Sequence, residues 1–291
     1  MTAYRGWATA GATYRFVGSH LRDCVVMAIV PILFASAVLL AILLFIPEPG
    51  TGFPGPAMFK ATFVVTLASW LVQTLLYVMF AVAWHRHYLL EGQPTGPFAI
   101  LTWQRRHWRF AFKGVIVGVA FLIVGFLVLL VAMPVLQTLI ARIGSMSVFF
   151  AAAIAINFAI SAILYYLMSR FLLAFPAASV DDETVGLGAS WDLTGGHSLQ
   201  FFLALLLVVG PFLLLQYLAS YAGALIFGPA MLAPSPSFLV PTILIQQVLA
   251  FVAIALATTA ASITYRQLKA IDDADRAAAA AAAGPPDAAT G

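Results

Sequence analysis

The sequence predicts an all-α fold, a polytopic membrane bundle of six transmembrane helices. Of its 291 residues, 63% are hydrophobic and only 9% are charged, and the mean hydropathy is +1.01. Soluble domains carry about 25% charged residues, so this chain has too few charges to keep a folded surface in water. These values exclude a soluble protein, a disordered protein and a nucleic-acid binder with a broad basic face.

Six stretches contain the roughly 20 mostly apolar residues that a helix needs to cross a hydrocarbon core of about 30 Å. Each stretch is too long and too unbroken for the alternating pattern of a barrel strand. We therefore predict helical spans at about residues 24–46, 61–84, 110–134, 148–174, 198–227 and 238–265.

These spans form one membrane domain, residues 24–268, which lies between two shorter regions. Residues 1–23 mix apolar and basic side chains, as is typical of an amphipathic arm at a membrane surface. Residues 269–291 contain an unbroken run of alanines followed by glycine and proline. This low-complexity composition predicts a disordered tail.

Basic residues are distributed unevenly across the predicted membrane. Of the 14 Lys and Arg residues, all but Lys60 and Arg142 fall on one side, in the arm, the tail and the ends of the second and fourth spans. Lys and Arg concentrate on the cytoplasmic side of membrane proteins. We expect a multi-pass protein of the bacterial inner membrane with both termini in the cytoplasm.

The chain also carries the marks of a threefold repeat of helical hairpins with cytoplasmic interfacial helices. One histidine precedes each odd-numbered span, a few positions after an aromatic residue: His20, His107 and His197. One arginine closes each even-numbered span: Arg86, Arg170 and Arg266. A repeat of this kind indicates that one hairpin cannot bury its own faces. The concentration of Lys and Arg on the cytoplasmic side would by itself account for the three arginines, but it would not account for the three histidines.

The loop after the second span combines basic and aromatic residues. Its cluster of arginines is large enough to hold the head group of an anionic lipid such as cardiolipin, and tryptophans anchor proteins at the membrane interface. The predicted contact residues are Arg86, Arg105, Arg106 and Arg109, with Trp103 and Trp108 as anchors. An arginine cluster that only sets the topology remains an equal alternative.

The spans contain uncharged polar residues near their centres. Gln73 and Asn157 lie at the same depth relative to the arginines that close their spans. These two side chains could line a path for a solute. The same two side chains could instead form hydrogen bonds between helices, and this structural role is favoured over the solute path. The spans carry no central carboxylate, which argues against a proton- or sodium-coupled pump.

The sequence contains no pattern typical of a catalytic or cofactor-binding site. Walker, dinucleotide-binding, zinc-protease and serine-hydrolase motifs are all missing. His85 and His87 are two residues apart, so a helix points them in different directions. Interfacial histidines beside lipid phosphates are favoured over a metal site. We expect no enzyme activity, no cofactor and no metal, and we expect the carboxylates of residues 181–183 to lie on a solvated loop.

Two short motifs resemble a known group of membrane proteins. The exit of the second span, Ala-Val-Ala-Trp84-His85-Arg86-His87-Tyr88, resembles a motif of uncharacterised six-span proteins from alphaproteobacteria. The stretch from Arg170 to Pro176, followed by Trp191-Asp-Leu-Thr194-Gly195-Gly196, is similar to the membrane domain fused to some glycerophosphodiester phosphodiesterases. The resemblance implies a six-span fold. It implies no phosphodiesterase activity, because the catalytic domain of that family is missing here.

The sequence thus favours a non-enzymatic scaffold or accessory protein. Its expected partners are anionic membrane lipids or another membrane protein, held at the cytoplasmic interface, and nucleic acid is not among them. The alternative is a transporter or channel for a small neutral or lipid-like solute.

Overall fold

The structure is a computed structural model that describes residues 4–45, 56–90, 93, 95–143, 160, 162–227 and 236–282. Within these ranges the chain forms helices joined by turns and contains no β-strand. The predicted all-α class is therefore confirmed.

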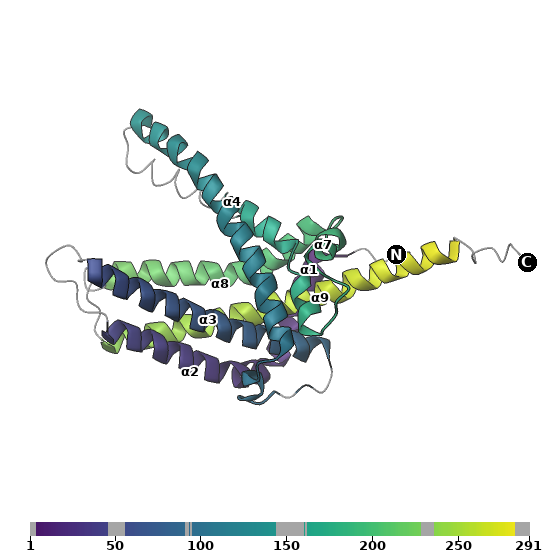
Figure 1. The fold of residues 1–291 in the computed structure, drawn as a ribbon, viewed down its shortest axis with the longest axis horizontal. Coiled ribbons are helices and arrows are strands. Elements are labelled where there is room, and N and C mark those ends of the chain that lie inside the picture. Colours follow the sequence, from purple (N-terminus) through teal and green to yellow (C-terminus); the bar gives the residue numbers. More distant parts are fainter. Residues whose placement is uncertain are drawn as a thin grey trace, which may run out of the picture.

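Four long helices lie side by side in a bundle: α2 (Leu21–Phe45), α3 (Pro56–Leu89), α8 (Ser198–Phe227) and α9 (Pro236–Ala282) (Figure 1). Helix α9 packs against the other three. The largest buried side chains of this bundle include Phe80 and Trp84 on α3 and Phe251 on α9, whose rings contact one another. The core of the bundle therefore centres on the α3–α9 contact.

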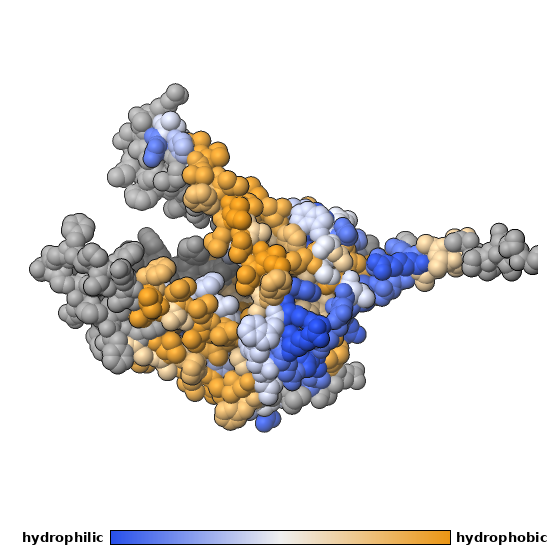
Figure 2. All heavy atoms as spheres, in the orientation of Figure 1, coloured by the Kyte–Doolittle hydropathy of each residue, from blue (hydrophilic) through white to orange (hydrophobic). Residues whose placement is uncertain are grey.

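Helix α4 (Arg105–Ile143) diverges from this bundle (Figure 1). Its base packs against α3 and against the short helix α6 (Ala174–Ser179). Only 6% of its most apolar stretch is buried, compared with 28–33% for α2, α3 and α9. Leu122 and Val131, for example, are 74% and 69% exposed. The outer part of α4 thus presents an apolar surface, coloured orange in Figure 2.

Among the described residues, four helices are long and apolar enough to cross a membrane, and a fifth is added if the bent pair of α7 (Leu187–Leu193) and α8 counts as one span. The two helices of this pair meet at 98°. Most of the predicted span 148–174 lies outside the described residues. Its described end, residues 162–169, is helical and gives way to a tight turn at residues 170–173, so this helix ends before the predicted residue 174.

The short elements gather at one end of the bundle, where hydrophilic residues also concentrate (Figures 1 and 2). We call this the polar end, and define it by α1 (Gly6–Ser19), the 3₁₀-helix η1 (Ala99–Leu101), α6, α7 and the loop of residues 180–186. It also carries the first turn of α4 and the exit of α3.

Helix α1 buries one face, which packs along α8 and α9. Its buried residues recur at helical spacing: Gly6, Thr9, Ala10, Thr13 and Val17. A β-carbon on Gly6 would lie 2.1 Å from the carbonyl oxygen of Gln200, so only glycine permits this approach of the two backbones.

The hydroxyl of Tyr14 in α1 also bonds to the backbone of α8. It donates to the carbonyls of Leu207 and Val208, at 3.0 Å each. Pro211 lies four residues after Leu207 and has no N–H to donate to that carbonyl. Tyr14 thus satisfies an acceptor that the proline leaves free, which stabilises α8 in an apolar medium.

The carboxyl-terminal region differs from its prediction. Helix α9 continues through residue 269 to Ala282, where the sequence composition predicted a disordered tail. Alanine has the highest helix propensity of all residues. An alanine run that continues an existing helix needs no new nucleation, so the helix extends into it.

Candidate functional site at the polar end

An acidic loop, Asp181 to Glu183, follows α6 and faces the base of α4. Arg106 lies 3.5 Å and Arg109 lies 3.8 Å from a carboxylate oxygen of Asp181, and Arg109 also pairs with Glu183. Asp181 has a φ of 59°, in the left-handed region that aspartate tolerates better than most residues. The loop therefore contacts α4 through ion pairs, while Asp181 and Glu183 remain exposed, as expected of a solvated loop.

Asp182 points the other way, toward α9. Its carboxylate accepts hydrogen bonds from Tyr265 and Lys269 of α9 and from both the backbone N–H and the hydroxyl of Thr184, at 2.9 and 2.6 Å. Burial alone would raise the pKa of Asp182, but the bonds from Lys269, Thr184 and Tyr265 outweigh it and hold the pKa well below its usual value. This carboxylate thus links the loop to α9.

Two further cations hold the same segment. Lys113 of α4 donates to the carbonyls of Ala174 and Val185, at 3.1 and 3.2 Å. Arg86, at the end of α3, donates to the carbonyl of Ser179 at 3.0 Å. Basic residues of α3, α4 and α9 therefore converge on residues 174–185, which comprise α6 and the acidic loop, and most of the predicted arginine cluster has a partner within the protein.

Arg105 differs from the other arginines of the predicted lipid-binding set. Arg106 and Arg109 face the acidic loop, while Arg105 is exposed and its side chain bonds to none of the described residues. Trp108 and Phe112, three and seven positions further on, lie on the same helical face. They are 64% and 66% exposed. We call these three residues the α4 patch.

Trp103, the other predicted anchor, is half-buried and stacks on the ring of His107 with centroids 5.2 Å apart. The Nδ1 of His107 accepts a hydrogen bond from the backbone N–H of Gln104 at 2.9 Å. A side chain in the first turn that bonds back to the residue before the helix is a capping interaction. His107 thus fixes the start of α4.

Of the two residues predicted to line a polar path, the structure describes Gln73; Asn157 lies outside the described residues. The amide nitrogen of Gln73 donates to the hydroxyl of Tyr77 at 2.6 Å and to Gln247 on α9 at 3.1 Å. Gln247 is 4% exposed. These bonds favour helix packing over a solute path as the role of Gln73.

Further toward the polar end, α3 and α9 are joined by polar bonds that the sequence analysis missed. Trp84 donates to the hydroxyl of Thr259 at 2.8 Å, and His85 bonds to Ser262 at 2.7 Å. Beside them Tyr4, which precedes α1, bonds to Thr264 of α9 at 3.0 Å. The sequence does contain a pattern that predicts such bonds, because hydroxyl residues cluster between 258 and 264 in an otherwise apolar span. We call this contact the hydroxyl seam.

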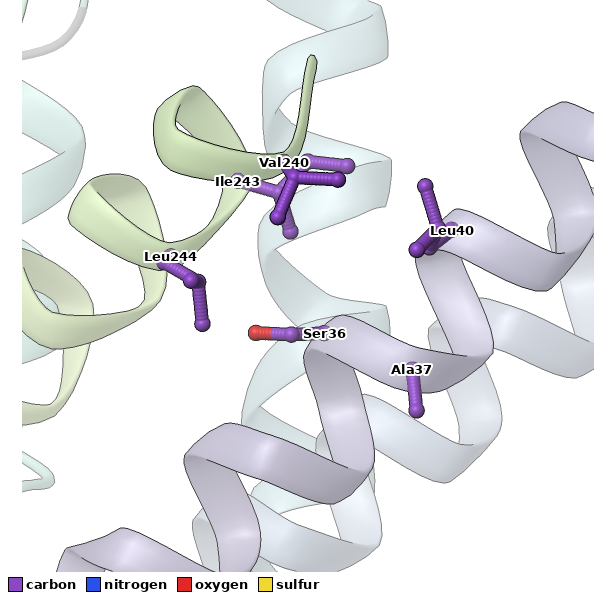
Figure 3. Close-up of a pocket in the computed structure, with 6 residues that line it drawn as sticks. All are labelled: Ser36, Ala37, Leu40, Val240, Ile243 and Leu244. Atoms are coloured by element: carbon purple, nitrogen blue, oxygen red, sulfur yellow. The ribbon is translucent and has the colours of Figure 1, made fainter. Parts of the chain in front are cut away.

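A small hollow lies between α2 and α9, farther from the polar end (Figure 3). Its volume is about 80 Å³, and its lining is apolar except for the hydroxyl of Ser36, which points toward α9. Ligand pockets measure roughly 300–1,000 Å³, so this hollow does not fit a drug-sized solute.

A larger hollow of about 190 Å³ lies at the polar end between α7 and α9. It is lined by charged residues of both signs. Lys269 bonds to Asp182 and Arg276 pairs with Asp272, so the cations of this hollow already have carboxylate partners. The hollow is therefore a poorer match for an anion than the α4 patch.

No family model, curated protein or solved structure matches this chain. The resemblance to the membrane domain of glycerophosphodiester phosphodiesterases therefore stays a prediction.

Proposed function

We propose that this protein is a non-enzymatic accessory protein of the bacterial inner membrane, which holds an anionic lipid head group at its polar end. In this proposal the polar end faces the cytoplasm, and six spans cross the bilayer as three hairpins. The short helices that precede α2, α4 and α8 support the repeat, and the concentration of basic residues at one end supports the orientation.

The α4 patch is the observation that carries this proposal. Arg105 supplies a positive charge at the start of α4, and the first turn of that helix contains no acidic residue. Helix N-termini attract anions, so the charge and the helix end act on the same phosphate. The exposed rings of Trp108 and Phe112 follow on the same face, where they would lie among the acyl chains.

The rest of the arginine set supports a narrower site than the sequence predicted. Arg106 and Arg109 are already paired with carboxylates, and a lipid would have to compete with those partners. Arg105 has no carboxylate partner among the described residues that a lipid would have to displace. The lipid phosphate would therefore bind at Arg105, with Arg106 and Arg109 contributing only through their charge.

The test measures lipid retention by native mass spectrometry of the full chain, released from nanodiscs that contain cardiolipin and phosphatidylcholine. The wild type should retain cardiolipin selectively. Arg105→Gln should weaken retention about fivefold, since one basic residue near an anionic surface contributes about 1 kcal/mol. Adding Trp108→Ala should weaken it further.

Arg276→Gln is the matched control, because Arg276 is exposed and pairs with Asp272 on α9, away from the patch. The proposal is wrong if the wild type shows no preference for cardiolipin, or if both arginine variants lose it equally. A protein that copurifies in a fixed ratio and leaves when Arg105 is replaced would assign the patch to a membrane-protein partner and overturn the lipid assignment.

A further inference from the structure

A second group of side chains at the polar end lies apart from the α4 patch. His20 follows the last residue of α1, Asp23 is in the first turn of α2, and His87 is in the last turn of α3. One ligand atom from each of the three lies within 4.8 Å of the other two, and all three residues are half-buried. The group brings two imidazoles and one carboxylate together.

The separation of His87 and Asp23 does not fit a hydrogen bond. The Nε2 of His87 is buried and has no hydrogen-bond partner in the described part of the chain. Its nearest carboxylate oxygen, Oδ2 of Asp23, is 3.7 Å away, beyond the usual 2.7–3.2 Å of a hydrogen bond. Two ligands of a tetrahedral zinc ion, each about 2.0–2.1 Å from the metal, are separated by roughly 3.4 Å. The observed 3.7 Å between Nε2 of His87 and Oδ2 of Asp23 is close to that separation.

His20 is held in the way that metal-binding histidines usually are. Its Nδ1 lies 3.0 Å from the carbonyl oxygen of Phe16. The hydroxyl of Ser19 also lies 3.0 Å from this Nδ1. A carbonyl only accepts, so the Phe16 contact is a hydrogen bond in the tautomer that protonates Nδ1, and that tautomer leaves the lone pair of Nε2 free for a metal. A second ring nitrogen bonded to a backbone carbonyl is the common outer contact of a zinc-ligating histidine.

Aromatic rings fix both imidazoles. Phe16 stacks on His20 with centroids 4.3 Å apart, and Trp84 lies 5.4 Å from His87. The two histidine rings are themselves 5.4 Å apart. Rings that are held in this way lose little further freedom when a metal binds, so the arrangement is preorganised.

We infer that His20, Asp23 and His87 form a binding site for a divalent transition metal, with Zn²⁺ as the ion that two imidazoles and one carboxylate suit best. A water molecule would complete the coordination. The site joins the α1–α2 corner to the end of α3, so the metal clamps the first hairpin at the polar end. The Phe16–Tyr88 ring contact, 4.8 Å between centroids, closes the same corner.

The experiment uses the full chain without a histidine tag, in nanodiscs, after removal of metal by a chelator. Equilibrium dialysis against Zn²⁺, with the bound metal counted by mass spectrometry, should give one ion per chain. His87→Gln and Asp23→Asn should each weaken binding by about tenfold or more. His197→Gln is the matched control, because His197 is also half-buried at the polar end but contacts Tyr4 instead of this group.

A second measurement does not depend on how the variants fold. In the wild type, Zn²⁺ should protect His20 from acylation by diethyl pyrocarbonate, while the labelling of His197 stays unchanged. Zn²⁺ should also raise the unfolding temperature of the wild type, and Mg²⁺ should not. The inference is overturned if the wild type binds no stoichiometric Zn²⁺, if folded His87→Gln binds it as the wild type does, or if Zn²⁺ leaves the labelling of His20 unaltered. An ion pair between His87 and Asp23 alone would produce those negative results.

Discussion

Helices α9 and α4 are both long and apolar, yet the protein holds them differently. Helix α9 contacts α1, α2, α3, α6, α7 and α8, and the hydroxyl seam bonds it to α3. Helix α4 is held at its base by Lys113 and the arginine–carboxylate pairs, and its outer part is largely exposed. In lipid, apolar surface gives no strong preference for protein over acyl chains. Specific polar contacts and close packing, rather than hydrophobicity, therefore fix the position of a helix in this protein.

A matched pair of phenylalanines provides the strongest test of this comparison. Phe80 in the bundle is fully buried, and Phe126 on α4 is 62% exposed. Phe80→Ala should lower the free energy of unfolding by about 3–5 kcal/mol, because it removes packing that the neighbours cannot restore. Phe126→Ala should change it by less than about 1 kcal/mol. Thermal unfolding in the same detergent measures both, and equal losses would refute the contrast between the two helices.

The link between the acidic loop and α9 should respond to acid. The pKa of Asp182 lies below its unfolded value of about 3.9, so its stabilising effect is present above that pH and is lost as the pH falls further. Asp182→Asn should cost about 1.5–3 kcal/mol at pH 7, the range for hydrogen bonds to a charged group.

The readout is the unfolding temperature of both proteins between pH 7 and pH 3. The difference between wild type and Asp182→Asn should shrink below about pH 4, because the carboxylate of the unfolded wild type then takes up a proton while the folded carboxylate still resists it. Asp275→Asn is the control, since Asp275 is exposed on α9. A difference that stays constant with pH would contradict the role assigned to Asp182.

Two glycines of α1 test how closely this helix must approach the bundle. A β-carbon on Gly6 would clash with the backbone of α8, while one on Gly11 meets nothing within 4 Å. Gly6→Ala should therefore destabilise the protein by about 1–3 kcal/mol. Gly11→Ala should be neutral or slightly stabilising, because alanine favours the helix. Circular dichroism melting curves of the two variants separate these outcomes.

The smallest expected effect concerns the hydroxyl of Tyr14. Tyr14→Phe removes the donor to the Leu207 carbonyl and should cost about 0.6–1 kcal/mol, the usual range for a hydrogen bond within a membrane. The double variant Tyr14→Phe with Pro211→Ala restores an N–H to that carbonyl. In the Pro211→Ala background, Tyr14→Phe should then lower the free energy of unfolding by less than it does in the wild type. An equal loss in both backgrounds would show that the proline is irrelevant to this bond.

The sequence was sufficient to predict the helical class and most of the long helices, because those depend on local composition and spacing. It also placed His85 and His87 on different faces of one helix, and the structure confirms this in their separate partners, Ser262 and Asp23. For residues 269–282 the prediction of disorder was wrong, because an alanine run favours helix despite its low complexity; residues 283–291 lie outside the described residues.

Partners distant in sequence could not be predicted from local patterns. Arg106 and Arg109 carry the same charge pattern whether they meet lipid or a carboxylate some 75 residues later. His20, Asp23 and His87 likewise come together only through the packing of α2 against α3. Tertiary structure alone distinguishes Arg105 from its neighbours.

The length of α9 determines how far from the membrane a partner could bind at the carboxyl-terminal end of this helix. Its 47 residues rise about 1.5 Å each and span about 70 Å, more than twice the roughly 30 Å of a hydrocarbon core. In Figure 1 its carboxyl-terminal part projects past the other helices. A partner captured at its tip would be held by a stiff spacer, tens of ångströms from the lipid surface, so α9 would fix the reach of the protein as well as its core.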